Sequence, residues 1–381
     1  MSLGWRRWRV AAAALTVLCS VAACTAAQET PAPTAREEQA SAAPVPTKAP
    51  PNYRAMEQEL ERRITDRRTG LQAVRAVLVS VDGKTVIAHY RASRSSEHAH
   101  VFSVTKSVMS ILVGIALDQG YLKSLDQTLG ESLPKYRSQM TDQVAAITLR
   151  QLLTHTSGIP GNGMGSSGAF ALAADDAVGL ILTYGLLNDP GTVFDYSNSG
   201  SHLVGAVLAE ATGRPVLDYA REQLFNPLGI KTRPAYEGFD AGEPTSQFEK
   251  DGFAWAADRQ GIHTGCCWLK LTTPDMLKIG ELYLNEGSWK GQRIVSAAWV
   301  RDSTTSQVTA EQLGPAGGYG YFWWLDQLRG HRSYAAVGSF GQLMAVVPDL
   351  KLVVAVSSRP DGYADEADVG PILDGIVSGL E

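Results

Sequence analysis

A serine and a lysine three residues apart, Ser103 and Lys106, stand at the head of a strongly apolar run. The residues from Val108 to Leu117 are rich in aliphatic side chains, which predicts a helix through the core. A spacing of three places both side chains on one helix face, so the amine can reach the hydroxyl and take its proton. The pattern indicates a serine nucleophile with a lysine base. Taken alone, the pattern is explained more simply by a capping serine beside a surface lysine.

A second polar pair, Tyr196 and Asn198, precedes another helical pattern far downstream. A phenol can relay a proton, and an amide can orient Lys106 or hold a substrate carbonyl. In isolation, a buried tyrosine beside a capping asparagine would be the simpler explanation. The combination of both pairs in one chain favours a shared active site.

Together these segments resemble the serine β-lactamase and penicillin-binding-protein superfamily, in which S-x-x-K, Y-x-N and K-T-G elements build one site. The closer likeness is to its class C-type branch of esterases, D-aminopeptidase-like enzymes and 6-aminohexanoate-dimer hydrolase. The resemblance implies that Ser103 is acylated, that Lys106 is its base, that Tyr196 is a second base and that Asn198 orients the substrate. The stretches that carry it lie in the family's order at 103–107, 152–160, 196–198, 226–230 and 346–349.

The third element departs from the family pattern. Where K-T-G would fall, on a strand near the C-terminus, residues 338–342 read G-S-F-G-Q. Ser339 stands in place of the lysine and lacks the charge that attracts a β-lactam carboxylate. Gly341 keeps the small residue that lets a substrate lie close to the strand. This departure argues against efficient β-lactam turnover.

The resemblance to this family implies two further expectations. His331 or Arg332, on the preceding stretch, could replace part of the missing charge. The oxyanion hole would consist of the backbone N–H groups of Ser103 and Gln342, which need no particular side chain.

Other patterns carry less chemistry. The chain has no G-x-S-x-G element, which argues against an α/β-hydrolase. Residues 163–168 match G-x-G-x-x-G, but they follow a Gly/Pro loop and not the strand that a dinucleotide site needs. We therefore interpret them as a flexible loop. Cys266 and Cys267 are adjacent, so they lack the C-x-x-C spacing that lets two sulfurs bind one metal ion, although His263 is near in sequence. We therefore expect a buried or strained thiol pair, and we expect neither a metal nor a cofactor. His155 is interpreted as a structural hydrogen-bonding residue. The aromatic run 319–324 is interpreted first as a half-buried strand and second as a substrate-binding wall.

The N-terminus predicts export. Three arginines precede an apolar run, residues 10–23, that is too short to span a bilayer and has the layout of a secretory signal. The run ends before Cys24 in a sequence that resembles the lipobox of bacterial lipoproteins. We therefore expect a signal peptide at 1–23, a lipid on Cys24 and a location on the extracytoplasmic face of the membrane in the cell envelope. Residues 24–51, rich in Ala and Pro, are expected to form a disordered tether.

Charge and length bound the partners. The full chain has 34 basic and 39 acidic residues, and removal of the signal with its three arginines would leave 31 basic and 39 acidic residues. This negative net charge argues against nucleic acid as a partner. The expected partners are a small ester, amide or short peptide-like substrate and, through the lipid anchor, the membrane. Residues 52–381 are long enough for one catalytic domain with a large core.

Strand patterns at both ends of this domain surround a helical middle. We expect an α/β (α+β) fold of the β-lactamase/transpeptidase type, in which an antiparallel sheet is flanked by helices and carries an inserted all-α lobe. The expected activity is a serine hydrolase that cleaves ester or amide bonds through a Ser103 acyl-enzyme. The alternatives are a β-lactamase or D-Ala-D-Ala carboxypeptidase, and a non-catalytic penicillin- or peptidoglycan-binding protein.

Overall fold

The computed structural model describes residues 50–66, 69–161, 173–236, 246–313, 317–359 and 368–381. The predicted signal peptide, Cys24, nearly all of the tether and the glycine motif at 163–168 lie outside the described residues. Within these ranges, no helix is both long enough and apolar enough to cross a bilayer.

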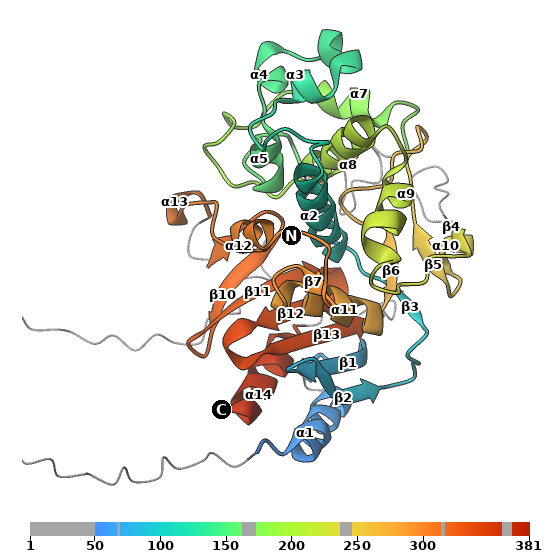
Figure 1. Ribbon diagram of the computed structural model, residues 1–381, viewed down its shortest axis with the longest axis vertical. Helices are drawn as coiled ribbons and strands as arrows, with labels where there is room; N and C mark the ends of the chain where they lie inside the picture. Colours follow the sequence, from blue (N-terminus) through green and yellow to red (C-terminus); the bar gives the residue numbers. More distant parts are fainter. Residues whose placement is uncertain (1–49, 67–68, 162–172, 237–245, 314–316, 360–367) are drawn as a thin grey trace, which may run out of the picture.

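A seven-stranded sheet forms the centre of one lobe (Figure 1). Its order is β2-β1-β13-β12-β11-β10-β9, and all neighbours are antiparallel. The predicted antiparallel sheet is confirmed, and both ends of the chain contribute to it. The strands are β1 (Val74–Val81), β2 (Lys84–Tyr90), β9 (Gly318–Tyr319), β10 (Trp324–Leu328), β11 (His331–Gly338), β12 (Gln342–Val347) and β13 (Leu352–Ser358).

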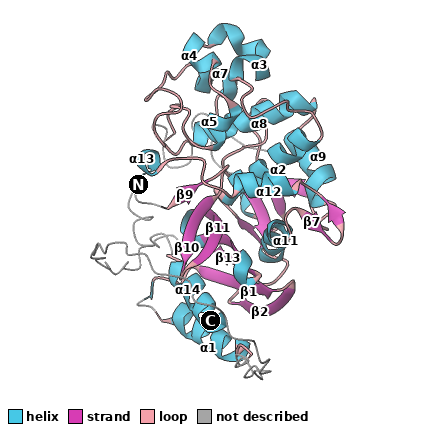
Figure 2. Ribbon diagram, turned by 60° about the vertical axis from the view of Figure 1, so that its left-hand side comes forward, coloured by secondary structure: helices cyan, strands magenta, loops and turns pink. Residues whose placement is uncertain are grey.

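The strand alternation divides the core between the two faces of this sheet. In β1, Val77 and Val79 belong to one buried cluster, whereas Ala76 and Leu78 belong to the other, as a period of two requires. Helices α1 (Tyr53–Thr65) and α14 (Gly370–Leu380) pack on the first face, and α2 (Val104–Asp118) and α11 (Thr273–Leu284) pack on the second. Figure 2 shows α1 and α14 together below the sheet.

The helical lobe is inserted between β2 and β9 and lies above the sheet in both views (Figures 1 and 2). Helix α2 connects the two lobes, because it contacts α8 on one side and β11 and β12 on the other. The lobe contains α3 (Leu129–Ser132), η3 (Pro134–Gln139), α4 (Asp142–Ala145), α5 (Leu149–Leu153), α7 (Ala177–Leu182), α8 (Asn198–Thr212), α9 (Val216–Ala220) and the π-helical turn η4 (Arg221–Phe225).

A small second sheet has the order β3-β6-β5-β4. Its strand β3 leads directly into Ser103, and β6 pairs with it, so this sheet supports the start of α2. The bounds are β3 (His98–His100), β4 (Ala235–Tyr236), β5 (Phe253–Trp255) and β6 (Leu269–Thr272). The remaining elements are α10 (Ser246–Glu249), β7 (Ser288–Trp289), β8 (Gln292–Arg293), α12 (Ala297–Ser303), α13 (Ala310–Leu313), η5 (Ser339–Gly341) and η6 (Pro348–Leu350).

One strand prediction is wrong. The aromatic run 319–324 is not a single half-buried strand, because the chain leaves β9 at Tyr319 and re-enters the sheet only at Trp324. Between them Phe322 has φ 61°, a left-handed conformation that interrupts an extended chain. The alternating aromatic pattern was produced by a tight reversal with buried side chains, which a period of two cannot distinguish from a strand.

Candidate active site

Ser103 occupies the N-cap of α2, and its side chain makes no capping hydrogen bond. Its hydroxyl therefore remains available for chemistry. The residue before it, Phe102, has φ 48°, which bends the chain sharply between β3 and the helix. The backbone N–H of Ser103 donates none of the hydrogen bonds of the described residues, as an oxyanion donor requires.

Lys106 lies one turn further along α2 and is 1% exposed. Its Nζ donates to Ser103 Oγ at 3.1 Å, to Asn198 Oδ1 at 2.7 Å and to the backbone oxygen of Cys266 at 3.0 Å. The amide and peptide oxygens can only accept, so they occupy two N–H groups in either protonation state. The third position, toward Ser103, is a donor in the ammonium and a lone pair in the amine. This arrangement allows Lys106 to receive the proton of the serine.

Asn198 reaches Lys106 because it begins α8. The preceding Ser197 is the N-cap, and its Oγ accepts from the N–H of Gly200 at 2.9 Å. The cap fixes the direction of the first turn and thereby the position of the Asn198 side chain. The sequence therefore brings together three of its predicted site residues, Ser103, Lys106 and Asn198.

His155 supports this turn from behind, as its structural interpretation predicts. The N–H of Ser197 donates to His155 Nδ1 at 3.1 Å, and the N–H of Asp195 donates to the His155 backbone oxygen at 2.8 Å. Burial, aided by the charge of Lys106, holds the pKa of His155 well below its ordinary value. The imidazole is therefore neutral and can accept at Nδ1.

Tyr196 lies on the other side of the amine. Lys106 Nζ is 4.6 Å from the centroid of its ring, and the ring of Trp324 lies parallel to it at 6.2 Å. The Tyr196 hydroxyl takes part in none of the hydrogen bonds found among the described residues. Trp324 thus forms part of a wall next to the site, which agrees with the second interpretation of the aromatic run.

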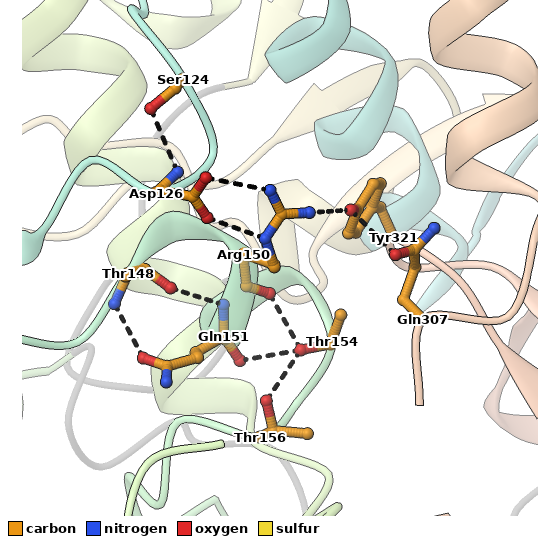
Figure 3. A network of polar contacts seen from close by, with 9 residues as sticks. All are labelled: Ser124, Asp126, Thr148, Arg150, Gln151, Thr154, Thr156, Gln307 and Tyr321. Atoms are coloured by element: carbon orange, nitrogen blue, oxygen red, sulfur yellow. Dashed lines mark hydrogen bonds and ion pairs between the residues drawn. The ribbon is translucent and has the colours of Figure 1, made fainter. Parts of the chain in front are cut away.

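The segment that carries Tyr321 and Trp324 is held against the helical lobe by a polar network (Figure 3). Arg150 of α5 pairs with Asp126 at 2.9 Å and donates to the hydroxyl of Tyr321, which in turn donates to Gln307 at 3.0 Å. Nearby, Ser107 Oγ donates to the Phe322 backbone oxygen at 2.7 Å. These contacts attach the aromatic segment to both α5 and α2.

The third predicted element lies beside the nucleophile, but its middle is not a strand. Residues Ser339–Gly341 form the turn η5 between β11 and β12. A Cβ on Gly338 would lie 2.4 Å from the Val101 backbone oxygen, so only glycine permits this approach of the turn to the chain before Ser103. Phe340 has φ 63°, and its ring lies 5.0 Å from that of Phe102.

Gln342 begins β12 and is fully buried. Its side chain donates to the Ser358 backbone oxygen at 2.7 Å and accepts from the Ser358 N–H at 3.2 Å, which ties β12 to the end of β13. The amide side chain is therefore structural. The role of its backbone N–H in an oxyanion hole stays a prediction.

The suggestion that His331 or Arg332 replaces the missing lysine is wrong. Both lie at the end of β11 opposite to Gly338, about 20 Å away at roughly 3.3 Å per residue. Arg332 donates to the Thr304 backbone oxygen at 2.6 Å, and His331 lies near the carboxylates of Asp349 and Glu381.

Sequence reasoning missed the backbone oxygen of Cys266 as the third acceptor of Lys106. A peptide oxygen has no residue-specific signal, so only the fold reveals it. Cys266 and Cys267 are free and buried, as predicted. Across the described ranges, no group of three or more His, Cys, Asp or Glu side chains is arranged to hold a metal ion.

Comparisons with known proteins point to one family. The Beta-lactamase family matches residues 58–376. Penicillin-binding protein 4 of Amycolatopsis lactamdurans is 26% identical over 275 residues, which cover 67% of this chain and 70% of that protein. The D-alanyl-D-alanine-carboxypeptidase/endopeptidase AmpH of Escherichia coli is 29% identical over 175 residues, 42% of this chain and 45% of AmpH. PbpX of Bacillus subtilis is matched over 36% of its length, so the chain spans less than half of these last two relatives.

Solved structures share the fold. EstCE1, a hydrolase with promiscuous acyltransferase activity, has a TM-score of 0.65 at 20% identity, with 86% of this chain and 98% of EstCE1 covered. A class C beta lactamase from Rhodobacter sphaeroides has a TM-score of 0.61 at 20% identity, with 86% and 99% covered. At such identity the likeness concerns the fold alone.

Proposed function

Because this chain belongs to the Beta-lactamase family, we propose that it is a serine hydrolase that cleaves esters or amides through an acyl-enzyme on Ser103. The observation that carries this proposal is the position of Lys106 Nζ, 3.1 Å from Ser103 Oγ and 2.7 Å from Asn198 Oδ1. The Lys106 amine is buried, and the Ser103 hydroxyl makes no capping hydrogen bond with α2. The hydroxyl is therefore free to attack a substrate while the amine takes its proton.

Acylation begins when the Ser103 hydroxyl attacks the substrate carbonyl and Lys106 takes its proton. The two N–H groups engaged by Asn198 and the Cys266 oxygen keep the lone pair of the amine directed at the serine. The free backbone N–H of Ser103, together with that of Gln342, stabilises the negative charge on the carbonyl oxygen.

The leaving group then needs a proton. Tyr196 borders the amine and is partly exposed, so a substrate can reach this residue. In the proposed sequence the phenol passes a proton to the leaving alcohol or amine, and the proton that Lys106 took from Ser103 returns to the phenolate by way of water. Water releases the acyl group by the reverse of these steps.

The walls of the site favour substrates without a carboxylate. Two pairs of aromatic rings lie near the site: Phe102 with Phe340, next to Ser103 in the chain, and Tyr196 with Trp324, next to Lys106. Ser339 provides no positive charge where the family's lysine would stand. Neutral esters with an apolar acyl group suit these surroundings better than a β-lactam.

A D-alanyl-D-alanine carboxypeptidase is the second candidate, because AmpH has that activity in its name and is 29% identical to this chain. The missing cation at Ser339 weighs against it, since such a peptide ends in a carboxylate. Kinetics on a short-chain aryl ester, a D-alanyl-D-alanine peptide and a chromogenic cephalosporin in one buffer separate the candidates. The ester is expected to have the highest kcat/KM.

Labelling with a fluorophosphonate tests the nucleophile. We expect one adduct, located on Ser103 by peptide mapping, and none in Ser103→Ala. Ser107 is a matched control, because it lies one helical turn after Ser103 and next to Lys106 in sequence, but its hydroxyl donates to the Phe322 backbone oxygen. An adduct on Ser107, Ser157 or Ser339 that persists in Ser103→Ala would disprove the assignment, and no adduct at all would favour a protein that only binds.

A further inference from the structure

Cys266 and Cys267 lie directly behind the proposed catalytic amine. The backbone oxygen that accepts from Lys106 Nζ at 3.0 Å belongs to Cys266, so it is part of the peptide bond that joins the two cysteines. Both residues are free thiols, 1% and 8% exposed. Whatever changes the geometry of that peptide bond therefore changes a contact of Lys106.

The surrounding loop holds this peptide bond in place from both sides. A Cβ on Gly265 would lie 2.1 Å from the Ser201 backbone oxygen, so the chain before Cys266 is pressed against α8. After it, Thr264 Oγ1 donates to the Cys267 backbone oxygen, and the Trp268 N–H donates to His100 Nε2 at 3.0 Å. With its neighbours fixed, the Cys266 carbonyl cannot turn without losing contacts.

The two side chains belong to one small buried cluster. The neighbouring Cys267 side chain, together with the charges of Lys106 and His202, lowers the pKa of the Cys266 thiol. Burial raises the pKa of Cys267. The pair thus contains one sulfur suited to attack as a thiolate and one that remains a thiol.

We propose that Cys266 and Cys267 form a reversible oxidation site, at which closure of a disulfide between adjacent residues turns the Cys266 carbonyl away from Lys106 and slows acylation of Ser103. This inference rests on the proposed function for its effect on activity, but not for the oxidation itself. The oxidant is a small peroxide, which the proposed location in an oxidising envelope permits.

The chemistry balances over two steps. The Cys266 thiolate attacks one peroxide oxygen, the O–O bond breaks, and the departing oxygen takes a proton to become water, which leaves a sulfenic acid. The Cys267 thiol then attacks the Cys266 sulfur, loses its proton and expels the sulfenic oxygen as a second water. Two electrons pass from the two sulfurs to the peroxide.

The geometry makes such a disulfide strained and easily reduced. Consecutive Cα atoms are about 3.8 Å apart across a trans peptide, below the roughly 4.4–6.8 Å at which disulfides are relaxed. The ring closes only if the enclosed peptide bond twists, and that bond carries the Lys106 acceptor. Strained disulfides are the ones that thiol reductants reduce most readily, as a reversible site requires.

Tryptic mapping of the full-length protein tests the oxidation directly. The peptide 260–270 contains both cysteines and excludes Cys19 and Cys24. After brief treatment with hydrogen peroxide, this peptide is expected to lose two hydrogens and to regain them with dithiothreitol. A peptide that stays a dithiol, or that goes directly to sulfinic acid, would overturn the proposal whatever the enzyme's activity.

The rate of Ser103 labelling by the fluorophosphonate tests the consequence. Oxidised wild-type protein should be labelled about tenfold more slowly, the factor for one lost hydrogen bond to a charged group, and dithiothreitol should restore the rate. Cys267→Ser and Cys267→Ala cannot form the ring and should keep their rate under the same treatment. Unchanged labelling of a protein whose 260–270 disulfide has formed would refute the regulatory part. Absence of labelling in the reduced wild type would instead count against the proposed function.

Discussion

The amine of Lys106 lies over the face of the Tyr196 ring, 4.6 Å from its centroid, rather than beside its hydroxyl. The ring and the hydroxyl of Tyr196 can therefore be separated by mutation. The ring contributes a cation–π contact and shields the amine, whereas the hydroxyl has no structural partner among the described residues and is free to act on the leaving group.

Tyr196→Phe keeps the ring and removes the hydroxyl. We expect Ser103 acylation by an aryl ester to change little, because a nitrophenolate leaves without a proton. Turnover of an amide with the same acyl group should fall by about 10²–10⁴-fold, the usual contribution of a general acid. The measurement is kcat/KM for both substrates with wild type and variant. Equal losses on the two substrates would show that the phenol does not protonate the leaving group.

Asn198→Asp replaces a neutral acceptor of Lys106 with a carboxylate at almost unchanged shape. The new charge would favour the ammonium form, which cannot accept the proton of Ser103, so kcat/KM should fall by about 10²-fold or more and recover partly at higher pH. A carboxylate in the first turn of α8 is favourable for the helix, so the protein should still fold. Asn198→Ala is the matched control: a pH profile with the same shape in both variants would contradict this account.

Ser339→Lys tests the cause of the expected substrate preference. A lysine in this turn could add a charge-assisted hydrogen bond to a substrate carboxylate, about 1.5–3 kcal/mol or roughly tenfold to a hundredfold in relative kcat/KM. The ratio of ester to cephalosporin turnover should therefore shift toward the cephalosporin, although Phe340 limits the gain. A wild-type enzyme that already prefers the cephalosporin would support the β-lactamase alternative.

We expect His155 to make the free energy of unfolding depend on pH. Its pKa is depressed in the folded protein, so the unfolded chain binds a proton first as the pH falls below about 6.5. The free energy of unfolding should then decrease by up to about 1.4 kcal/mol for each pH unit on account of this residue. His155→Asn keeps an acceptor near the position of Nδ1 and tolerates φ 56°, but does not titrate there. Urea unfolding at pH 7 and pH 5 should show a smaller decrease in the variant, and an equal decrease would assign the effect elsewhere.

For the N-terminus we propose that Cys24 carries lipid and holds the catalytic domain at the outer face of the membrane. Each buried CH₂ contributes about 0.8 kcal/mol, so several acyl chains would anchor the protein durably. Cys24→Ser should move the protein from the membrane fraction to the soluble fraction or stall its processing. Recovery in the membrane fraction at the wild-type level would argue against lipidation.

The sequence predicted most of what positions the site. The β1–β2 hairpin follows from Asp82-Gly83, whose φ values of 51° and 72° are those of the tight turn that this pair favours. Ser103, Lys106 and Asn198 meet as the spacing suggested, because each lies at the start of a helix whose apolar pattern is long and regular.

The features that the sequence did not predict depend on backbone conformations without a residue-type signal. Phe102, Phe322 and Phe340 all adopt left-handed φ values that propensity assigns to glycine or asparagine. The sequence pattern therefore predicts a strand at the reversal around Phe322 and at the turn around Phe340. Distances along β11, which exclude His331 and Arg332, need a register that only the fold supplies.

Strand β13 pairs with β1 on one side and with β12 on the other, although β1 and β13 stand at opposite ends of the domain sequence. Without residues Leu352–Ser358, the β1–β2 hairpin has no neighbouring strand and is separated from the sheet of β9 to β12. A chain that lacks this strand therefore contains Ser103 and Lys106 but not the continuous sheet behind them. Such long-range pairing is also slow to form. The proposed hydrolytic activity would thus require the last strand of the domain as well as the nucleophile and its lysine.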